Sequence, residues 1–256
     1  HLDQRPARWI DLHAAADCQA RGREPQTGFL AGRERRRHRT KAGITEMVAA
    51  STGNVAISYS AYASRAGVKL WAFVTSLVPA VKMREIALYG SQVIKITGSY
   101  DQCKQVASEF ARQRHLYQDM GARTITSIEA MKTIAFEIAE QLTSIQGPPT
   151  DSLWLTPDWY VQAISGGMGP LGVYKGFREM KQMGWIKHIP SFAPIQAEGC
   201  APMVTSWKKG LEKVEPVTSP KTRIETLATG DPGRAYEFLR EYVNSSNGAF
   251  ESVRDE

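Results

Sequence analysis

Short apolar runs alternate with helical segments along this chain from about residue 42 onward. Runs rich in apolar and β-branched residues predict strands at 45–50, 68–74, 92–96, 159–164 and 192–196. The segments between and after them predict helices at 53–66, 79–89, 100–113, 128–142, 170–183, 201–210 and 233–243. Parallel strands need long crossover connections, which helices supply. The order therefore predicts an α/β fold with open, mostly parallel sheets covered by helices on both faces.

The composition is that of a globular protein, with 42% hydrophobic and 23% charged residues among 256. No apolar stretch is long enough to cross a bilayer and no signal-peptide pattern opens the chain, so we expect a cytoplasmic location without membrane contact. Three cysteines, Cys18, Cys103 and Cys200, stand far apart without metal-ligand spacing. They predict reduced thiols and no metal site.

The net charge of +6 is concentrated at one end of the chain. Residues 1–41 hold ten Lys and Arg against five Asp and Glu, so this segment contributes +5. A basic run can bind phosphate backbones. It is more often a solvated stretch, and we do not expect a nucleic-acid partner.

Two glycine turns lie where a predicted strand passes into a predicted helix. The first is Ser51-Thr52-Gly53-Asn54, and the second runs from Ser165 through Gly166, Gly167 and Met168 to Gly169. The first amides of a helix have no internal partner, and the helix dipole adds positive potential there. Such turns bind carboxylates and phosphates, which predicts a phosphorylated cofactor and an acidic substrate.

Each turn also has an interpretation without a ligand. Ser51 and Thr52 are good helix-capping residues, a role that is compatible with binding. Gly166, Gly167 and Gly169 could serve only to make a tight connection between strand and helix.

The helix predicted after the second turn carries a regular apolar stripe. Leu171, Tyr174, Phe177 and Met180 recur every three residues, and Gly184 follows as a stop signal. We expect this stripe to pack in the core.

Several further motifs occur in the order found in one enzyme family. They are Ala49–Asn54, Ala61–Gly67, Pro79 with Lys82, Tyr89–Val93, Lys132–Ile138, Lys175–Phe177 and Gln196–Pro202. Over roughly residues 42–254 the chain resembles threonine synthases, members of the fold-type II pyridoxal-phosphate (PLP) enzymes of the tryptophan synthase β-like superfamily. The resemblance implies two lobes, a small substrate-loop domain at 42–127 and a larger cofactor-phosphate domain at 128–256.

The resemblance also assigns roles to both turns. It implies that Ser51, Thr52, Gly53 and Asn54 bind the substrate carboxylate and that Asn54 also contacts the ring hydroxyl of PLP. It implies that the amides of 165–169, from Ser165 to Gly169, hold the PLP phosphate.

The activity implied is that of a PLP-dependent lyase of threonine and amino-acid biosynthesis, which converts O-phosphohomoserine to threonine and phosphate. Three alternatives remain open: a cysteate synthase, a threonine or serine dehydratase, and a non-catalytic relative that binds a phosphate ligand. The family resemblance implies a homodimer.

The chain departs from the family pattern at the Schiff-base lysine. The family places this lysine in a Ser-Phe-Lys-Asp motif before the first turn, and here Leu30 stands at that position. Lys41 is the first lysine of the chain and looks like an exposed residue at a helix end. We therefore expect no catalytic lysine and an inactive chain.

Two other departures concern the substrate phosphate and the pyridine nitrogen. The family's Asn-Pro-x-Arg stretch is absent from 126–132, so Lys82, Arg84 or Arg123 would have to bind a substrate phosphate. Family members continue beyond the point where this chain reaches Glu256, and a later Ser or Thr contacts the pyridine nitrogen. We expect a chain that is incomplete at both ends.

Residues 1–41 lack the periodicity of the rest, which predicts a poorly ordered or aberrant segment outside the family. A frame-shifted or mis-started translation explains the abrupt change at Lys41, and a diverged N-terminus is the rival explanation. Reading the encoding DNA in all frames for Ser-Phe-Lys-Asp-like codons distinguishes the two.

Overall fold

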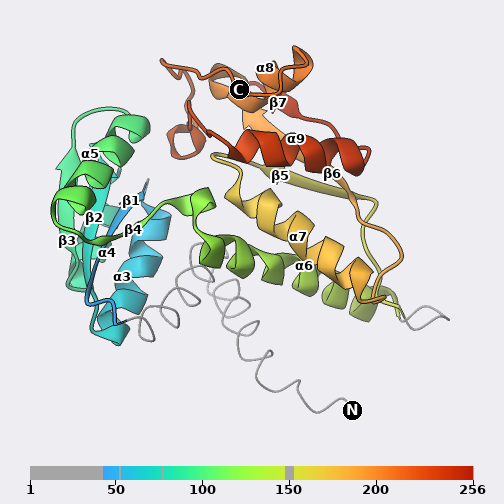
Figure 1. Cartoon of the computed structure of the whole chain (residues 1–256), viewed down its shortest axis with the longest axis horizontal. Coiled ribbons are helices and arrows are strands. Elements are labelled where there is room, and N and C mark those ends of the chain that lie inside the picture. Colours follow the sequence, from blue (N-terminus) through green and yellow to red (C-terminus); the bar gives the residue numbers. More distant parts are fainter. Residues whose placement is uncertain (1–42, 52, 77, 148–152, 256) are drawn as a thin grey trace.

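The computed structural model describes residues 43–51, 53–76, 78–147 and 153–255. Predictions for the segment 1–41, including Leu30 and Lys41, and for Thr52 lie outside these residues. The described chain forms two lobes, each built on a parallel sheet with its own helices (Figure 1).

The small lobe contains a four-stranded sheet in the order β3-β2-β1-β4. Its elements are β1 (Glu46–Ser51), α3 (Asn54–Ala66), β2 (Lys69–Thr75), α4 (Ala80–Leu88), β3 (Gln92–Ile96), α5 (Tyr100–Gln113) and β4 (Tyr117–Asp119). All three strand pairs are parallel, with Glu46 opposite Lys69 in the central pair. On one face Met47 and Ala49 pack with α3, and on the other Val48 packs with α5.

The large lobe contains a three-stranded parallel sheet in the order β5-β6-β7. Its elements are β5 (Trp159–Ala163), α7 (Met168–Gln182), β6 (Ser191–Ala197), α8 (Pro202–Lys208), α9 (Ala235–Ser245) and β7 (Glu251–Val253), with short 3-10 helices at Glu198–Cys200 and Glu225–Leu227. A further 3-10 helix, η1 (Gly121–Arg123), and the long helix α6 (Ile125–Gln146) join the lobes.

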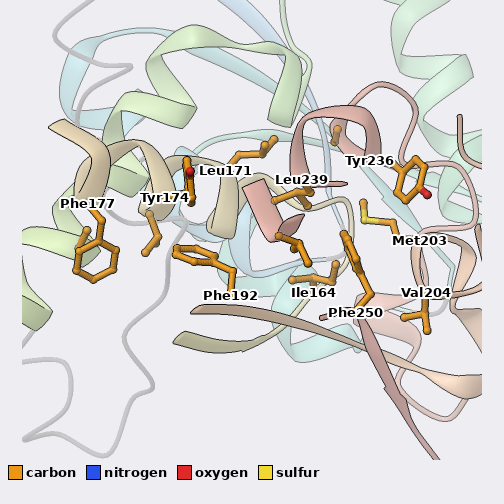
Figure 2. Packing of buried hydrophobic residues seen from close by; sticks show 14 of the residues in the cluster. Ile164, Leu171, Tyr174, Phe177, Phe192, Met203, Val204, Tyr236, Leu239 and Phe250 are labelled. Carbon is orange, nitrogen blue, oxygen red and sulfur yellow. The ribbon is translucent and has the colours of Figure 1, made fainter. Parts of the chain in front are cut away.

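The core of the large lobe lies between one face of its sheet and the helices α7 and α9 (Figure 2). Phe192 of β6 is central, and the ring of Tyr174 meets it edge-on, with 5.3 Å between the two ring centres. The predicted stripe of α7 is confirmed, because Leu171, Phe177 and Met180 are buried in this cluster. Gly184 has a φ of 71°, as its predicted role as a stop requires.

Two glycines of α7 let it approach α6 unusually closely. A Cβ added to Gly172 would lie 2.5 Å from the carbonyl oxygen of Ile128, and one added to Gly176 would lie 2.8 Å from that of Lys132. Any larger residue would therefore push the two helices apart. The position of α7 depends on this contact.

Helix α6 belongs to the cores of both lobes. Ala130 and Met131 pack in the small-lobe cluster, whereas Ala135 and Ala139 pack in the large-lobe cluster. The domain boundary predicted between residues 127 and 128 falls within the first turn of this helix.

Most predicted elements are present with small shifts at their ends. The strand 92–96 and the helix 100–113 have the predicted bounds, whereas α6 is longer than the predicted 128–142. Strands β4 and β7 were not predicted, because each has only three residues, too few to show an alternation of apolar and polar side chains. None of the helices in the described part of the chain has the length and apolar character that a membrane span requires.

We predict that Gly172→Ala and Gly176→Ala each destabilise the protein. Helix propensity alone would stabilise each variant by about 1 kcal/mol. The clash with the α6 backbone outweighs this gain, because overpacking costs about 1–3 kcal/mol. Urea unfolding measures the difference. Gly166→Ala is the control, since its added Cβ would meet its nearest neighbour only at 3.9 Å; equal stability of all three variants and the native chain would contradict close α6–α7 packing.

Candidate cofactor and substrate site

The first glycine turn follows β1 directly and begins α3. Ser51 is buried, and its Oγ accepts hydrogen bonds from the amides of Gly53 (3.0 Å) and Ala56 (3.1 Å). The predicted capping role of Ser51 is therefore present. The amides of Asn54 and Val55 have no acceptor among the described residues and are therefore available to a ligand or to water.

Lys82 of α4 lies against this turn. Its Nζ donates a hydrogen bond to Asn54 Oδ1 at 2.7 Å. A Cβ added to Gly53 would lie 3.0 Å from Cδ of Lys82, and Gly53 has a φ of 128°. The backbone conformation thus requires glycine, and a Cβ at this position would crowd the Lys82 side chain. The sequence marked Lys82 as part of a motif, but its contact with Asn54 is visible only in the structure.

The second turn begins α7 with Gly167 in the left-handed conformation, at a φ of 82°. The amides of 166–169 have no acceptor among the described residues, so they are available to an anion. A Cβ added to Gly167 would lie 2.6 Å from the side chain of Leu239, and one added to Gly169 would lie 2.5 Å from the side chain of Gln162. A turn that presents free amides and is crowded at Gly167 and Gly169 fits a phosphate group.

A hydroxyl pair closes one side of the second turn. Ser165 Oγ and Thr229 Oγ1 are 2.5 Å apart, and Thr229 is buried. The segment that carries Thr229 therefore packs directly beside the turn.

The two turns belong to different lobes, and one hydrophobic cluster includes residues next to both. Met168, the first residue of α7, packs against the cluster that contains Ala56 and Ile57 of the first turn of α3. Met131 of α6 belongs to the same cluster. Each turn follows the carboxyl end of its strand, β1 or β5, which is where ligands of open α/β sheets bind, and one hydrophobic cluster that includes Met131 extends between their helices.

The basic residues proposed for a substrate phosphate are spread around this region. Lys82 contacts the first turn, whereas Arg84 is exposed on α4. Arg123 approaches the large lobe, with a guanidinium nitrogen 3.1 Å from the position of a Cβ at Gly233. Near the start of α6, where the family pattern has an arginine, the Oγ of Ser127 is buried without a partner among the described residues.

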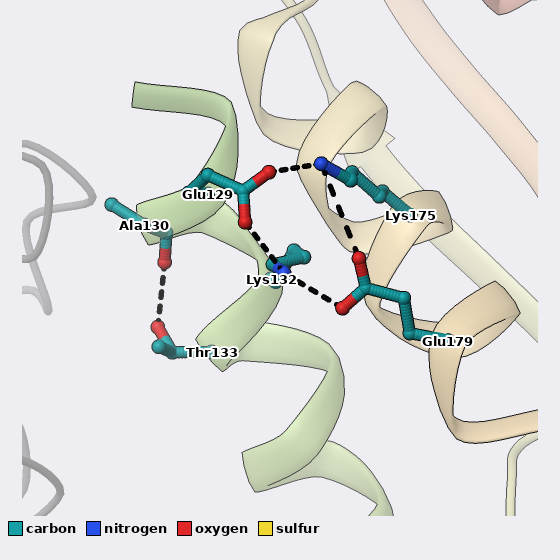
Figure 3. Close-up of polar contacts among 6 residues, drawn as sticks. All are labelled: Glu129, Ala130, Lys132, Thr133, Lys175 and Glu179. Carbon is teal, nitrogen blue, oxygen red and sulfur yellow. Dashed lines mark hydrogen bonds and ion pairs between the residues drawn. The ribbon is translucent and has the colours of Figure 1, made fainter. Parts of the chain in front are cut away.

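Four charged side chains hold α6 against α7 (Figure 3). Lys132 Nζ lies 2.6 Å from Glu129 and 2.7 Å from Glu179, and Lys175 pairs with the same two carboxylates. Burial alone would raise the pKa of Glu129, but hydrogen bonds from Lys132 and Lys175 outweigh it and lower that pKa. Burial would likewise lower the pKa of Lys132, but its two carboxylate partners raise it.

The two described cysteines are free thiols, as predicted, and Cys18 lies outside the described residues. Burial raises the pKa of Cys103 to about 11. Burial, with a smaller contribution from Asp101, raises the pKa of Cys200 to about 11. Both are therefore neutral at physiological pH and are poor nucleophiles.

The family model of the pyridoxal-phosphate dependent enzymes matches residues 28–256. The chain belongs to this family. The match confirms the resemblance to fold-type II PLP enzymes, the α/β fold class and pyridoxal 5′-phosphate as the cofactor. It begins at residue 28, so it includes Leu30.

Curated relatives agree with this family. A threonine synthase from Methanocaldococcus jannaschii is 29% identical over 215 residues, which cover 84% of this chain and 50% of that protein. One from Methanosarcina acetivorans is 30% identical, with the same coverage of 84% and 50%. This chain therefore spans about half the length of the curated relatives it matches.

Solved structures support the fold. A fungal L-serine ammonia-lyase from Rhizomucor miehei has a TM-score of 0.75 at 16% identity, covering 90% of this chain and 67% of that one. A processed form of threonine deaminase isoform 2 from Solanum lycopersicum has a TM-score of 0.70 at 16% identity, and the match covers 90% of this chain and 57% of that one.

We predict that Glu129→Gln destabilises the protein by about 1–2 kcal/mol near neutral pH, because the ion pairs are only partly buried. The lowered pKa of Glu129 means that its contribution is present above about pH 4.3 and is lost as the carboxylate protonates. The raised pKa of Lys132 means that its contribution is present below about pH 10.4 and is lost at higher pH. The difference in the free energy of unfolding between Glu129→Gln and the native chain should therefore shrink at both low and high pH.

Urea unfolding across this pH range measures the effect. Glu109→Gln is the matched control, because Glu109 pairs with Arg112 on the exposed surface of α5. An effect of Glu129→Gln that is no larger than that of Glu109→Gln, or that does not vary with pH, would contradict a stabilising role for the four charges.

Proposed function

We propose that this chain carries the binding framework of a threonine synthase-like, PLP-dependent lyase that acts on an amino acid. The observation that supports the proposal is that Met168, at the second turn, packs against the hydrophobic cluster to which Ala56, just after the first turn, belongs. Threonine synthases as curated relatives favour this member of the family. The natural substrate would be O-phosphohomoserine, with threonine and phosphate as products.

Each turn has a separate role in this proposal. The amides of 166–169, together with Ser165, hold the phosphate of PLP. Asn54 contacts the ring hydroxyl, and Ser51, Thr52 and Gly53 bind the substrate carboxylate. When bound, PLP supplies an electron sink that stabilises negative charge at the substrate α-carbon.

Lys82 is a positioning residue in this site. Its hydrogen bond fixes the amide oxygen of Asn54, so the amide nitrogen of Asn54 is directed away from Lys82. That nitrogen can then donate to the ring hydroxyl or to a carboxylate.

Position 30 limits what this chain can do. Leucine has no amine, so it can neither bind PLP covalently nor carry a proton to or from the substrate. We propose that this chain binds PLP through its phosphate without turnover.

A dehydratase acting on threonine or serine is the second candidate. The observation that favours it is Ser127 near the start of α6, a buried, uncharged hydroxyl in the region where the family pattern has an arginine for a substrate phosphate. Such an enzyme has no substrate phosphate to bind. A cysteate synthase and a non-catalytic binder of phosphate ligands are further alternatives, and a homodimer remains part of the proposal.

We predict that PLP binds the native chain and that Asn54→Ala weakens binding roughly tenfold, because one hydrogen bond to the cofactor is lost. Tryptophan fluorescence quenching gives both dissociation constants. Gln113→Ala, which removes an exposed amide from α5, should bind as the native chain does. Failure of the native chain to bind PLP, or equal binding by Asn54→Ala, would contradict the assigned roles.

We predict that borohydride reduction of the native chain with equimolar PLP labels no single lysine stoichiometrically. In Leu30→Lys a stoichiometric label should appear at residue 30. Peptide mass mapping locates the label. A stoichiometric label on Lys41 or another native lysine would show that this chain has its own catalytic amine.

The same Leu30→Lys variant separates the two candidate reactions. Phosphate release from O-phosphohomoserine supports a threonine synthase, whereas keto-acid formation from L-threonine or L-serine supports a dehydratase. Native chain treated identically is the control for reactions of free PLP.

A further inference from the structure

A pocket lies between the lobes, and its described lining residues include none from the two glycine turns. It encloses about 190 Å³. Thr75, Pro79 and Ser99 form its small-lobe wall, and Thr222 and Glu225 lie on its large-lobe wall. We infer that this pocket binds a small ligand that carries an ammonium group and hydroxyl groups.

The carboxylate of Glu225 identifies the cationic part of the ligand. Within the described part of the chain, Glu225 has no ion pair and its carboxylate accepts no hydrogen bond. No Lys, Arg or His is among the described residues that line the pocket. A carboxylate accepts hydrogen bonds and carries negative charge, so a primary ammonium complements it, whereas a phosphate would be repelled.

Two hydroxyl groups identify the neutral part. Ser99 Oγ accepts a hydrogen bond from the amide of Gln102 at 3.2 Å, and Thr222 Oγ1 accepts one from the amide of Ile224 at 3.0 Å. Neither hydroxyl hydrogen has an acceptor among the described residues. Both can therefore donate to ligand oxygens, and a ligand hydroxyl can accept these hydrogen bonds.

The walls of the pocket are anchored on opposite lobes. Segment 220–228 is tied to the large lobe by hydrogen bonds from the amide of Lys221 to Gly199 (2.9 Å) and from that of Arg223 to Asp255 (2.6 Å). Across the pocket, Tyr100 begins α5 of the small lobe, and its hydroxyl donates to the carbonyl of Ala50 at 3.4 Å. A ligand that contacts both walls would link the two lobes.

The pocket also adjoins the first glycine turn without including it. Val78 lines the pocket, and its Cγ1 lies 3.5 Å from the position of a Cβ at Gly53. Ligand in this pocket would therefore lie beside the first glycine turn, separated from it by Val78. Neither turn contributes a described lining residue, so the pocket's ligand need not be the substrate.

Isothermal titration with serinol (2-amino-1,3-propanediol) tests the inference. Serinol carries one ammonium and two hydroxyls but no carboxylate, so it cannot use the predicted carboxylate loop. We expect serinol to bind the native chain and glycerol, which lacks the ammonium, to bind at least tenfold more weakly. Glu225→Gln should weaken serinol binding at least tenfold, and Thr222→Val should weaken it to a smaller degree.

Glu212→Gln is the matched control, because Glu212 is an exposed carboxylate outside the pocket. Circular dichroism shows whether each variant is folded. Absence of serinol binding to the native chain, equal binding of glycerol, or unchanged binding to Glu225→Gln would each overturn the inference. Titrations with and without PLP separate this site from the proposed function, since serinol binding should persist even if PLP does not bind.

Discussion

The close contact between α6 and α7 determines where the proposed cofactor site can form. Gly172 and Gly176 let the backbones of the two helices approach to a distance that a single methyl group would prevent. Four charged side chains reinforce the contact on its polar side, and Met131 extends it toward the small lobe. Because α7 begins at the second glycine turn, whatever fixes α7 also fixes the direction of the free amides. The geometry of the proposed phosphate site is thus a consequence of helix packing.

The proposed chemistry rests on backbone groups rather than on reactive side chains. Free amides at the starts of α3 and α7 supply positive potential without a charged residue, which suits the phosphate and carboxylate groups that such sites bind. The buried thiols of Cys103 and Cys200 stay neutral. In the proposed function this scaffold binds and orients the cofactor without a covalent bond, because leucine stands at position 30, where the family resemblance leads us to expect a lysine. The proposal thus treats binding and turnover as separate properties of this chain.

Local sequence signals predicted those parts of the structure that local interactions determine. The bounds of α5 were predictable because Ser99 and Gln102 form a reciprocal cap at its start. Strand β4 could not be predicted, since the polar residues Gln118 and Asp119 become a strand only through pairing with β1. The two turns of the candidate site were recognisable from glycine placement. The hydrogen bond between Asn54 and Lys82 was not, because it joins helices whose approach depends on the packing of the whole lobe.

Helix α6 has a consequence for how the protein folds. Its first half completes one hydrophobic core with Met131, and the next turns complete the other with Ala135. Neither lobe can bury its apolar surface fully until this one helix has formed and docked on both sides. The lobes should therefore gain and lose their structure together, as a single cooperative unit, even though each has its own sheet.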